Sequence, residues 1–83
     1  MRVNFLDEFD MLLRREVRRL RRVRLASEVS QAELARRVGI SESQVFAIEK
    51  GRARPSTELL EQLATALEGE ASHLNDIRNG SGV

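Results

Sequence analysis

The chain of 83 residues has no cysteine, no tryptophan, no tyrosine and a single proline, and its apolar runs are only a few residues long. Without cysteine there are no disulfides and no thiolate metal ligands, which favours an intracellular compartment. The apolar runs are too short to span a bilayer. Acids at 7, 8 and 10, followed by arginines, stand where a signal peptide would be basic and then apolar. We therefore expect one small cytoplasmic domain with no membrane partner.

Residues for catalysis and metal binding are also scarce. His73 is the only histidine, so no second histidine and no cysteine can complete a metal site. The sequence contains no glycine-rich phosphate loop and no plausible nucleophile–base pair. Its acids are spread at helical spacings, as on solvated faces. We expect no catalytic residues, no metal and no cofactor, and therefore not an enzyme.

Charge is nearly balanced overall, at +1, but unevenly distributed. Residues 1–13 carry one arginine against three acids, a balance of −2. Residues 14–54 carry twelve basic against five acidic residues, a balance of +7, and residues 55–83 have a balance of −4. A clustered positive segment is typical of a protein that binds a polyanion. The alternative is a solvated charged surface.

Two short helices joined by a glycine turn are predicted in the middle of the chain. Ser30 with Glu33 forms one capping box, and Ser41 with Gln44 forms a second, eleven residues later. Gly39 lies between them. One such box is common by chance, whereas two boxes separated by a glycine are much rarer.

The apolar positions of these two helices support the same interpretation, because in each helix they fall on a single face. They are Leu34, Ala35 and Val38 in the first helix, Val45 and Ile48 in the second, and Ile40 in the turn. Ala35 is small at a point where two helices would cross closely. This pattern is typical of a helix-turn-helix, whose second helix enters the DNA major groove.

Elsewhere the sequence predicts three more helices and no strand. The five expected helices are Phe5–Ala26, Gln31–Val38, Glu42–Lys50, Thr57–Leu67 and a short helix that Ser72 caps. Asn4 is expected to cap the first helix, Gly51 to end the third in a left-handed conformation, and Gly69 to end the fourth. In the first helix, one face carries Leu6, Phe9, Leu13, Val17, Leu20 and Val23.

Between Leu20 and Leu74 the sequence resembles the Cro/C1-type (XRE) helix-turn-helix family. The residues that carry the resemblance are Val23-Arg24, Ser30-Gln31, Leu34-Ala35, Gly39-Ile40-Ser41, Ile48-Glu49-Lys50-Gly51, Pro55-Ser56, Leu63-Ala64 and Leu67. The resemblance implies an all-α, five-helix, phage-repressor-like DNA-binding domain over residues 20–78. Residues 1–19 would form an N-terminal extension, part of a long first helix, and residues 79–83 a flexible tail.

The resemblance also implies roles for single residues. Arg24 and Glu49 match the internal ion pair of the family, and Gln31 matches a position that contacts a DNA phosphate. The positions that usually contact bases are Glu42, Ser43, Gln44 and Ala47. An acid at the C-terminal turn of a helix is unfavourable by the helix dipole alone, so a cation partner would explain Glu49. The alternative is an exposed glutamate.

Two positions depart from the family pattern. Ser27-Glu28 stands in the turn where the family usually has a glycine, and Phe46 stands where a small polar residue is common. Phe46, like Ala47, is a candidate for contact with a thymine methyl group. Packing of Phe46 against the core or a second subunit is left open.

The other base contacts also have alternatives. Glu42 can accept from a cytosine amino group, and Gln44 can make a bidentate contact with adenine. Alternatively, Glu42 favours the helix N-terminus and Gln44 serves only in the capping box. The candidates for contact with DNA phosphates are Gln31, Arg36, Lys50, Arg52 and Arg54, together with some arginines of the first helix.

A module this small reads few base pairs, so we expect a homodimer on a pseudo-palindromic operator. Candidate interface residues, with intramolecular core as the alternative, are Phe5, Leu6, Phe9, Leu12, Leu74 and Ile77. The expected function is a sequence-specific double-stranded DNA-binding transcriptional regulator, either a repressor or an activator, with autoregulation as one option. The alternatives are an antitoxin of a toxin–antitoxin pair or a controller protein of a restriction–modification system. Either would bind a partner protein through the N-terminal extension.

Overall fold

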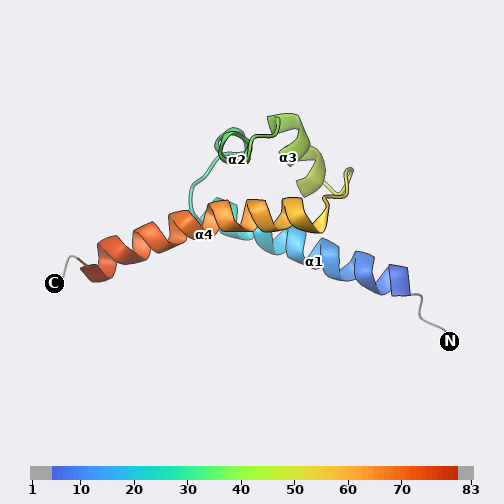
Figure 1. Ribbon diagram of the computed structural model, residues 1–83, viewed down its shortest axis with the longest axis horizontal. Coiled ribbons are helices and arrows are strands. Elements are labelled where there is room, and N and C mark those ends of the chain that lie inside the picture. Colours follow the sequence, from blue (N-terminus) through green and yellow to red (C-terminus); the bar gives the residue numbers. More distant parts are fainter. Residues whose placement is uncertain (1–4, 81–83) are drawn as a thin grey trace.

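The computed structural model describes residues 5–80, with side chains described for residues 8–68. Within this range the chain forms four helices and no strand: α1 (Phe5–Ala26), α2 (Gln31–Val38), α3 (Glu42–Glu49) and α4 (Thr57–Gly80). The long helices α1 and α4 lie across each other and point their outer ends in opposite directions, while α2 and α3 lie on one side of them (Figure 1). The molecule is elongated, with extents of 56 × 29 × 19 Å.

The all-helical fold is confirmed, two of the predicted helices have the expected bounds, and a third differs by one residue. α1 and α2 begin and end as predicted, and α3 ends one residue earlier, at Glu49. α1 is a single continuous helix that includes most of the expected N-terminal extension. The predicted cap at Asn4 lies outside the described residues.

The expectation of five helices is wrong, because α4 continues from Thr57 to Gly80 through both Gly69 and Ser72. A glycine inside a helix costs only about 1 kcal/mol relative to alanine, and no proline follows that would block the next turn. The flanking glutamates and alanines favour helix. Asn79 and Gly80, which were expected in a flexible tail, therefore belong to α4.

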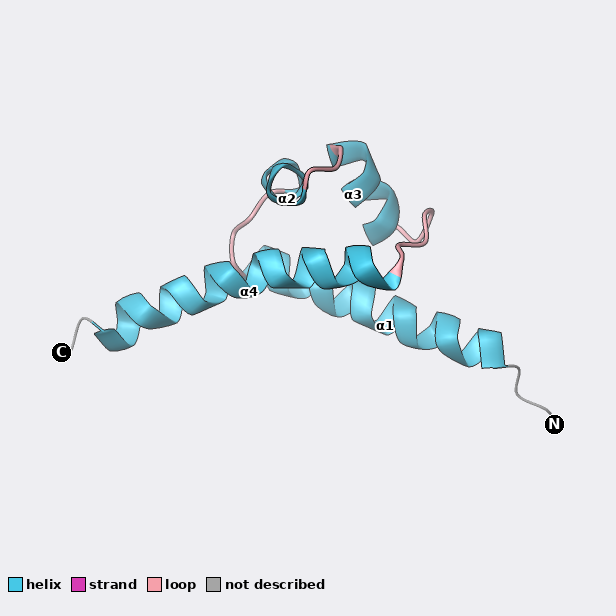
Figure 2. Cartoon of the chain, viewed as in Figure 1, coloured by secondary structure: helices cyan, strands magenta, loops and turns pink. Residues whose placement is uncertain are grey.

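The hydrophobic core lies where the four helices meet (Figure 2). Its most deeply buried side chains are Leu34 from α2, Val45 from α3, and Leu63 and Leu67 from α4. α1 contributes Val17 and Leu20, and Val29 packs from the turn that follows α1. The complete core consists of Val17, Leu20, Val29, Leu34, Ala35, Val45, Ile48, Leu63 and Leu67. α2 packs against α3 and α4, and α1 packs against both of the same helices. The short helix pair is thus held on a base of two long helices.

The capping interactions fix where α2 and α3 begin. At α3 the box is complete: the Ser41 hydroxyl accepts from the Gln44 N–H at 3.1 Å, and the Gln44 side-chain oxygen accepts from the Ser41 N–H at 2.8 Å. At α2 only half of the predicted box forms, with the Ser30 hydroxyl accepting from the Glu33 N–H at 3.0 Å. The Glu33 carboxylate binds Arg36 instead, because the guanidinium one turn later offers charge-assisted hydrogen bonds.

The turns after α1, α2 and α3 all place a residue in the left-handed conformation. Gly39 has φ 85° and Gly51 has φ 76°, as expected for glycine at a helix C-terminus. After α1 the same position is held by Glu28, with φ 58°. Here the Val29 N–H bonds the Arg24 carbonyl at 3.1 Å and the Glu28 N–H bonds the Leu25 carbonyl at 3.1 Å, which is a Schellman motif. The turn therefore forms without the glycine usual in the family, at the cost of a strained glutamate.

Candidate nucleic-acid interface

One side of α3 faces solvent and carries the predicted base-contacting residues. Glu42, Ser43, Gln44 and Phe46 are exposed, and Ala47 is half-buried. The opposite side, with Val45 and Ile48, is buried in the core. The C-terminal end of α3 lies toward the long helices, and its N-terminal end, which the turn joins to α2, lies farther from them (Figure 1). The structure thus brings the five candidate side chains together on one accessible surface, and their contact with DNA stays a prediction.

The side-chain amide of Gln44 has two hydrogen-bonding roles, one in the capping box and one predicted toward a base. Its oxygen accepts the Ser41 N–H of the capping box at 2.8 Å. A bidentate contact with adenine requires the same oxygen to accept from the adenine amino group while the NH₂ group donates to N7. The oxygen has two lone pairs, so it can accept from Ser41 and from a base together if the two donors approach from suitable directions.

Phe46 lies on the surface and not in the core, which excludes the core-packing alternative. Its exposed fraction is 40%. The Lys50 ammonium lies 5.7 Å from the ring centroid, and the Arg52 guanidinium lies 5.9 Å from it. These cation–π distances place two predicted phosphate-contacting residues around one aromatic ring.

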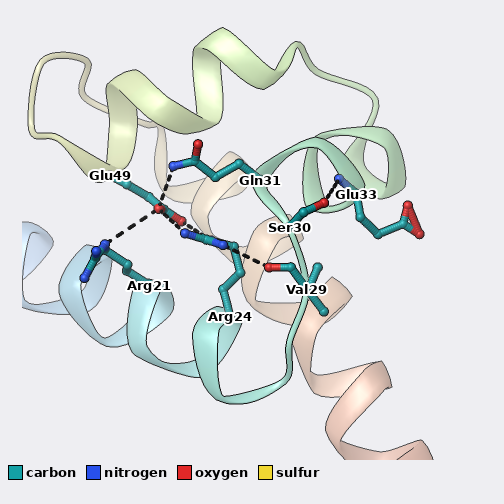
Figure 3. Close-up of polar contacts among 7 residues, drawn as sticks. All are labelled: Arg21, Arg24, Val29, Ser30, Gln31, Glu33 and Glu49. Atoms are coloured by element: carbon teal, nitrogen blue, oxygen red, sulfur yellow. Dashed lines mark hydrogen bonds and ion pairs between the residues drawn. The ribbon is translucent and has the colours of Figure 1, made fainter.

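The Arg24–Glu49 pair forms the polar centre of the site (Figure 3). The Arg24 guanidinium donates to both Glu49 carboxylate oxygens, at 2.7 and 2.8 Å, and to the Val29 carbonyl at 2.9 Å. The exposed fractions of the two side chains are 8% and 2%. The ion pair implied by the family resemblance is therefore present, and it joins the ends of α1 and α3.

The charge of Glu49 is maintained by its neighbours. Burial alone would raise the pKa of the carboxyl, but hydrogen bonds from Arg24 and Gln31, with the charges of Arg24 and Arg21, outweigh it and lower the pKa. The Arg21 guanidinium lies 4.0 Å from the carboxylate. Glu49 is thus ionised at neutral pH and stays paired.

Gln31, a predicted phosphate contact, takes part in this polar centre. Its side-chain NH₂ donates to Glu49 at 3.0 Å, and Figure 3 shows its oxygen pointing away from the carboxylate. The residue lies at the first turn of α2, where backbone N–H groups favour an anion. Its phosphate role stays a prediction, but the side chain as placed ties α2 to α3.

Arg36, another predicted phosphate contact, is engaged on the surface. Its guanidinium donates to both Glu33 oxygens, at 2.7 and 2.6 Å. The hydrogen bond and charge of Arg36, with a smaller contribution from Arg37, lower the pKa of Glu33 to about 2. The Arg36 side chain remains 72% exposed, so a phosphate would have to compete with Glu33 for it.

Arg54, in the loop between α3 and α4, contacts the beginning of α1. It donates to the Asp10 carboxylate at 2.8 Å, and its guanidinium lies 5.9 Å from the centroid of the Phe9 ring. Asp10 also pairs with Arg14 at 3.0 Å. Arg54, a predicted phosphate contact, is therefore held by two residues of α1.

A groove of about 530 Å³ separates α1 from this loop. It is lined by Asp10, Leu13, Arg14, Val17, Arg18 and residues 48–55. A second hollow of about 520 Å³ on α1 is lined by Met11, Arg14, Arg15, Arg18, Arg21 and Arg22. The basic surface thus continues from the α3–α4 loop along α1, as the charge distribution predicted.

Comparison with known families shows which protein family has this arrangement of helices. The model of the helix-turn-helix family HTH_3 matches residues 20–80, which include all of α2, α3 and α4. The chain belongs to this helix-turn-helix family. The resemblance inferred from the sequence is thereby confirmed.

The helix-turn-helix protein also has a curated relative. It is 45% identical over 49 residues to a protein of Methanothermobacter thermautotrophicus (strain Delta H) described as an uncharacterized HTH-type transcriptional regulator. The match covers 59% of this chain and 68% of the relative. No solved structure matches the chain.

Two contacts between α1 and the α3–α4 loop escaped the sequence prediction for this helix-turn-helix protein. Asp10 and Phe9 contact Arg54, which is 44 positions away from Asp10. Both residues precede the family domain, and no sequence pattern links them to the loop between α3 and α4. The only available signal was the acidic balance of residues 1–13 beside a strongly basic segment.

No described helix has both the length and the apolar character required to cross a membrane. Among the residues that the structure describes, no group of three or more histidine, cysteine or acidic side chains is arranged to hold a metal ion.

Proposed function

We propose that this helix-turn-helix protein is a transcriptional regulator that binds double-stranded DNA and reads the major groove with α3. The observation that carries the proposal is the exposed side of α3, held in position by the buried Arg24–Glu49 pair. Family membership and the relative described as a transcriptional regulator support the DNA-binding role. We further propose repression from a pseudo-palindromic operator by a homodimer.

In this proposal base recognition comes from the exposed side of α3. Glu42 would accept from a cytosine amino group, Gln44 would pair with an adenine edge, and Ser43 would bond either kind of base. Phe46 and Ala47 would contact thymine methyl groups. The capping box supports this role, because it holds the first turn of α3 in a defined position.

Affinity in this proposal comes from cations around the same helix. Lys50 and Arg52 flank Phe46, and Arg54 follows in the same loop. Gln31 and Arg36 on α2 complete the predicted phosphate set. Phosphate contacts supply affinity for any sequence, with strong dependence on salt, whereas base contacts supply discrimination.

We predict that Gln44→Ala and Arg54→Ala have different effects. Removing Gln44 should relax the preference at one base position by about 1–3 kcal/mol, because one bidentate contact is lost. Removing Arg54 should weaken binding to all sequences alike and lower the salt slope by about 1. Fluorescence anisotropy with a panel of single-base operator variants measures both. A base-preference profile left unchanged by Gln44→Ala would contradict its assigned role.

The proposed function is tested first with the DNA upstream of the protein's own gene. Anisotropy titrations at several salt concentrations compare this DNA with a scrambled duplex of equal composition. Binding at least about 10³-fold tighter to the upstream DNA supports an autoregulatory, sequence-specific regulator, and the stoichiometry tests the dimer. Equal, weak and strongly salt-dependent binding to both duplexes contradicts autoregulation and shows only the charged surface acting.

One observation favours a second candidate function. Phe9 and Leu12 near the start of α1 are exposed, at 43% and 56%. In an antitoxin or a controller protein such a surface would dock a partner protein, with DNA binding retained for autoregulation. A toxin or restriction gene next to this gene, and co-purification of its product with the chain, would distinguish this candidate from a regulator that acts alone.

A further inference from the structure

The first turns of α1 extend beyond the start of α4 (Figure 1). We define the α1 overhang as residues 5–12, which span about 12 Å at 1.5 Å per residue. Leu13 is the first described side chain of α1 that is buried. Before it, Phe9, Met11 and Leu12 have exposed fractions of 43%, 64% and 56%. Apolar side chains are therefore concentrated at a place the described helices leave open.

Two of these side chains continue a stripe that is covered farther along the helix. Leu12 and Val23 are eleven residues apart, close to three helical turns, so they lie on the same side of α1. Val23 packs against the core, whereas Leu12 is exposed. Phe9 precedes Leu12 by three residues and is its neighbour on the helix surface. The overhang thus lacks the cover that the same side of α1 has near its C-terminal end.

The charges of the overhang indicate what covers it. Glu8 and Asp10 give it acidic character, which disfavours DNA as the occupant. Asp10 already binds two of the chain's own arginines, Arg14 at 3.0 Å and Arg54 at 2.8 Å. The following turns of α1 carry further exposed arginines, at positions 15, 18, 19 and 22. α1 therefore has an acidic, apolar end and a basic remainder that are complementary to each other.

We propose that the α1 overhang is the docking surface for a second copy of this chain, with the two α1 helices antiparallel. In this arrangement Leu12 lies close to the twofold axis, and the acidic end of each helix lies against the turn of the other helix that carries the exposed Arg15 and Arg18, twice by symmetry. The twofold axis is perpendicular to the plane of the paired helices. Both α3 helices then lie on the same side of the dimer, as a pseudo-palindrome requires. The proposal supplies the homodimer of the proposed function, but it is tested without DNA.

The test is the molar mass of the full-length chain, measured by analytical ultracentrifugation over a range of concentrations. The wild type is expected to dimerise, and Leu12→Glu to raise the dimer dissociation constant at least about tenfold, because it puts a charge at the centre of the interface. Two controls replace equally exposed apolar residues: Met11→Glu, on another side of the overhang, and Leu25→Glu, at the far end of α1. Both controls should dimerise like the wild type, and circular dichroism should show all variants equally helical.

The same measurement at low and high salt tests the charge complementarity of the two α1 helices. Glu8→Lys should weaken the dimer at low salt and have little effect at high salt, because exposed charge pairs are screened. A wild type that stays monomeric overturns the proposal and leaves the overhang to a different protein. So does a Leu12→Glu variant that dimerises normally, or equal weakening by Leu12→Glu and Met11→Glu. Binding of Leu12→Glu to a half-site duplex tests the proposed function separately, since it requires one copy only.

Discussion

At the scale of single residues, the buried pair of Arg24 and Glu49 has the largest expected effect on the stability of the fold. One carboxylate receives hydrogen bonds from α1 and α2 while belonging to α3. Taking two charges out of water is expensive, so such a pair contributes little net stability when intact. Removing one partner is a different matter, because the remaining charge is then buried without compensation.

Replacing Glu49 should therefore destabilise the fold strongly. We expect Glu49→Gln to lower the free energy of unfolding by about 3 kcal/mol, because Arg24 loses its counter-ion. Glu33→Gln is the matched control and should change it little, since Glu33 and Arg36 form an exposed pair. Urea denaturation monitored by circular dichroism measures both. Equal effects of the two changes would contradict the burial argument.

The same pair gives the stability a defined pH dependence. The folded-state pKa of Glu49 is lowered, so its contribution is fully present above the unfolded value of about 4.3 and is lost as the pH falls through the folded pKa. Glu33, with its pKa at about 2, adds an exposed and therefore smaller contribution in the same acidic range. The wild type should accordingly lose stability below about pH 4.3, and Glu49→Gln less steeply.

Glu28 is the residue where the backbone is most clearly under strain. Its φ of 58° is unfavourable for a side chain with a Cβ atom. We expect Glu28→Asn to raise the free energy of unfolding by up to about 1 kcal/mol, because asparagine tolerates this conformation better. Glu16→Asn, an exposed site within α1, is the control and should destabilise. Thermal denaturation compares the two, and a lower melting temperature for Glu28→Asn would contradict the strain.

At the scale of helices, glycine has different effects at different positions. Gly39 and Gly51 end their helices with φ values of 85° and 76°, whereas α4 runs straight through Gly69. A glycine ends a helix only when the following residues take the chain elsewhere. After Gly39 and Gly51 a new segment must pack on the core, but after Gly69 nothing in the sequence opposes a further turn.

This difference predicts opposite results for the same substitution. Gly69→Ala should increase the helical content, because alanine stabilises a helix locally by about 1 kcal/mol relative to glycine. Gly39→Ala should lower the free energy of unfolding by about 1–2 kcal/mol through its backbone conformation alone, since an added Cβ meets no atom within 4 Å. Far-UV circular dichroism and urea denaturation measure the two effects. A loss of helicity in Gly69→Ala would contradict a continuous α4 and favour the predicted helix end at Gly69.

Much of the fold and part of the site could be predicted from the sequence. The bounds of α1, α2 and α3 follow from local signals, namely serine caps, glycine turns and apolar periodicity. The Arg24–Glu49 pair followed from the family resemblance. The contact of Arg54 with Asp10 could not be predicted, because it joins exposed side chains 44 positions apart. Gln31 and Arg36 were expected to face DNA, but each also has a carboxylate partner that spacing alone does not reveal.

At the scale of the whole molecule, the beginning of α1 and the α3–α4 loop act on each other through Asp10. Its carboxylate holds the Arg54 guanidinium at 2.8 Å, at a place where the proposed function requires a phosphate. The side chains of Arg54 and Asp10 are 55% and 35% exposed, so exchange of one anion for the other needs little rearrangement. If Arg54 contacts a DNA phosphate as proposed, Asp10 competes with that phosphate for the same guanidinium.

We therefore predict that Asp10→Asn binds DNA more tightly than the wild type. The gain should be similar for operator and scrambled duplexes, about two- to tenfold at low salt, because phosphate contacts carry no sequence information. In the Arg54→Ala background the same change should have a clearly smaller effect. Anisotropy titrations of the four proteins complete this cycle. Equal gains in both backgrounds would show that Asp10 acts through net charge and not through Arg54.

The way Glu49 joins three helices has a consequence for control of the protein. α3 has only eight residues, yet its last residue is bonded to α1 and to α2, and its inner side lies in the core. Opening this helix would break these bonds and its core contacts together, so we expect it to cost close to the free energy of global unfolding. We therefore expect that control of this protein does not work by melting α3, the helix proposed to face DNA. We expect a signal to act instead where the structure is open to solvent, as it is at the loop after α3 and at the beginning of α1.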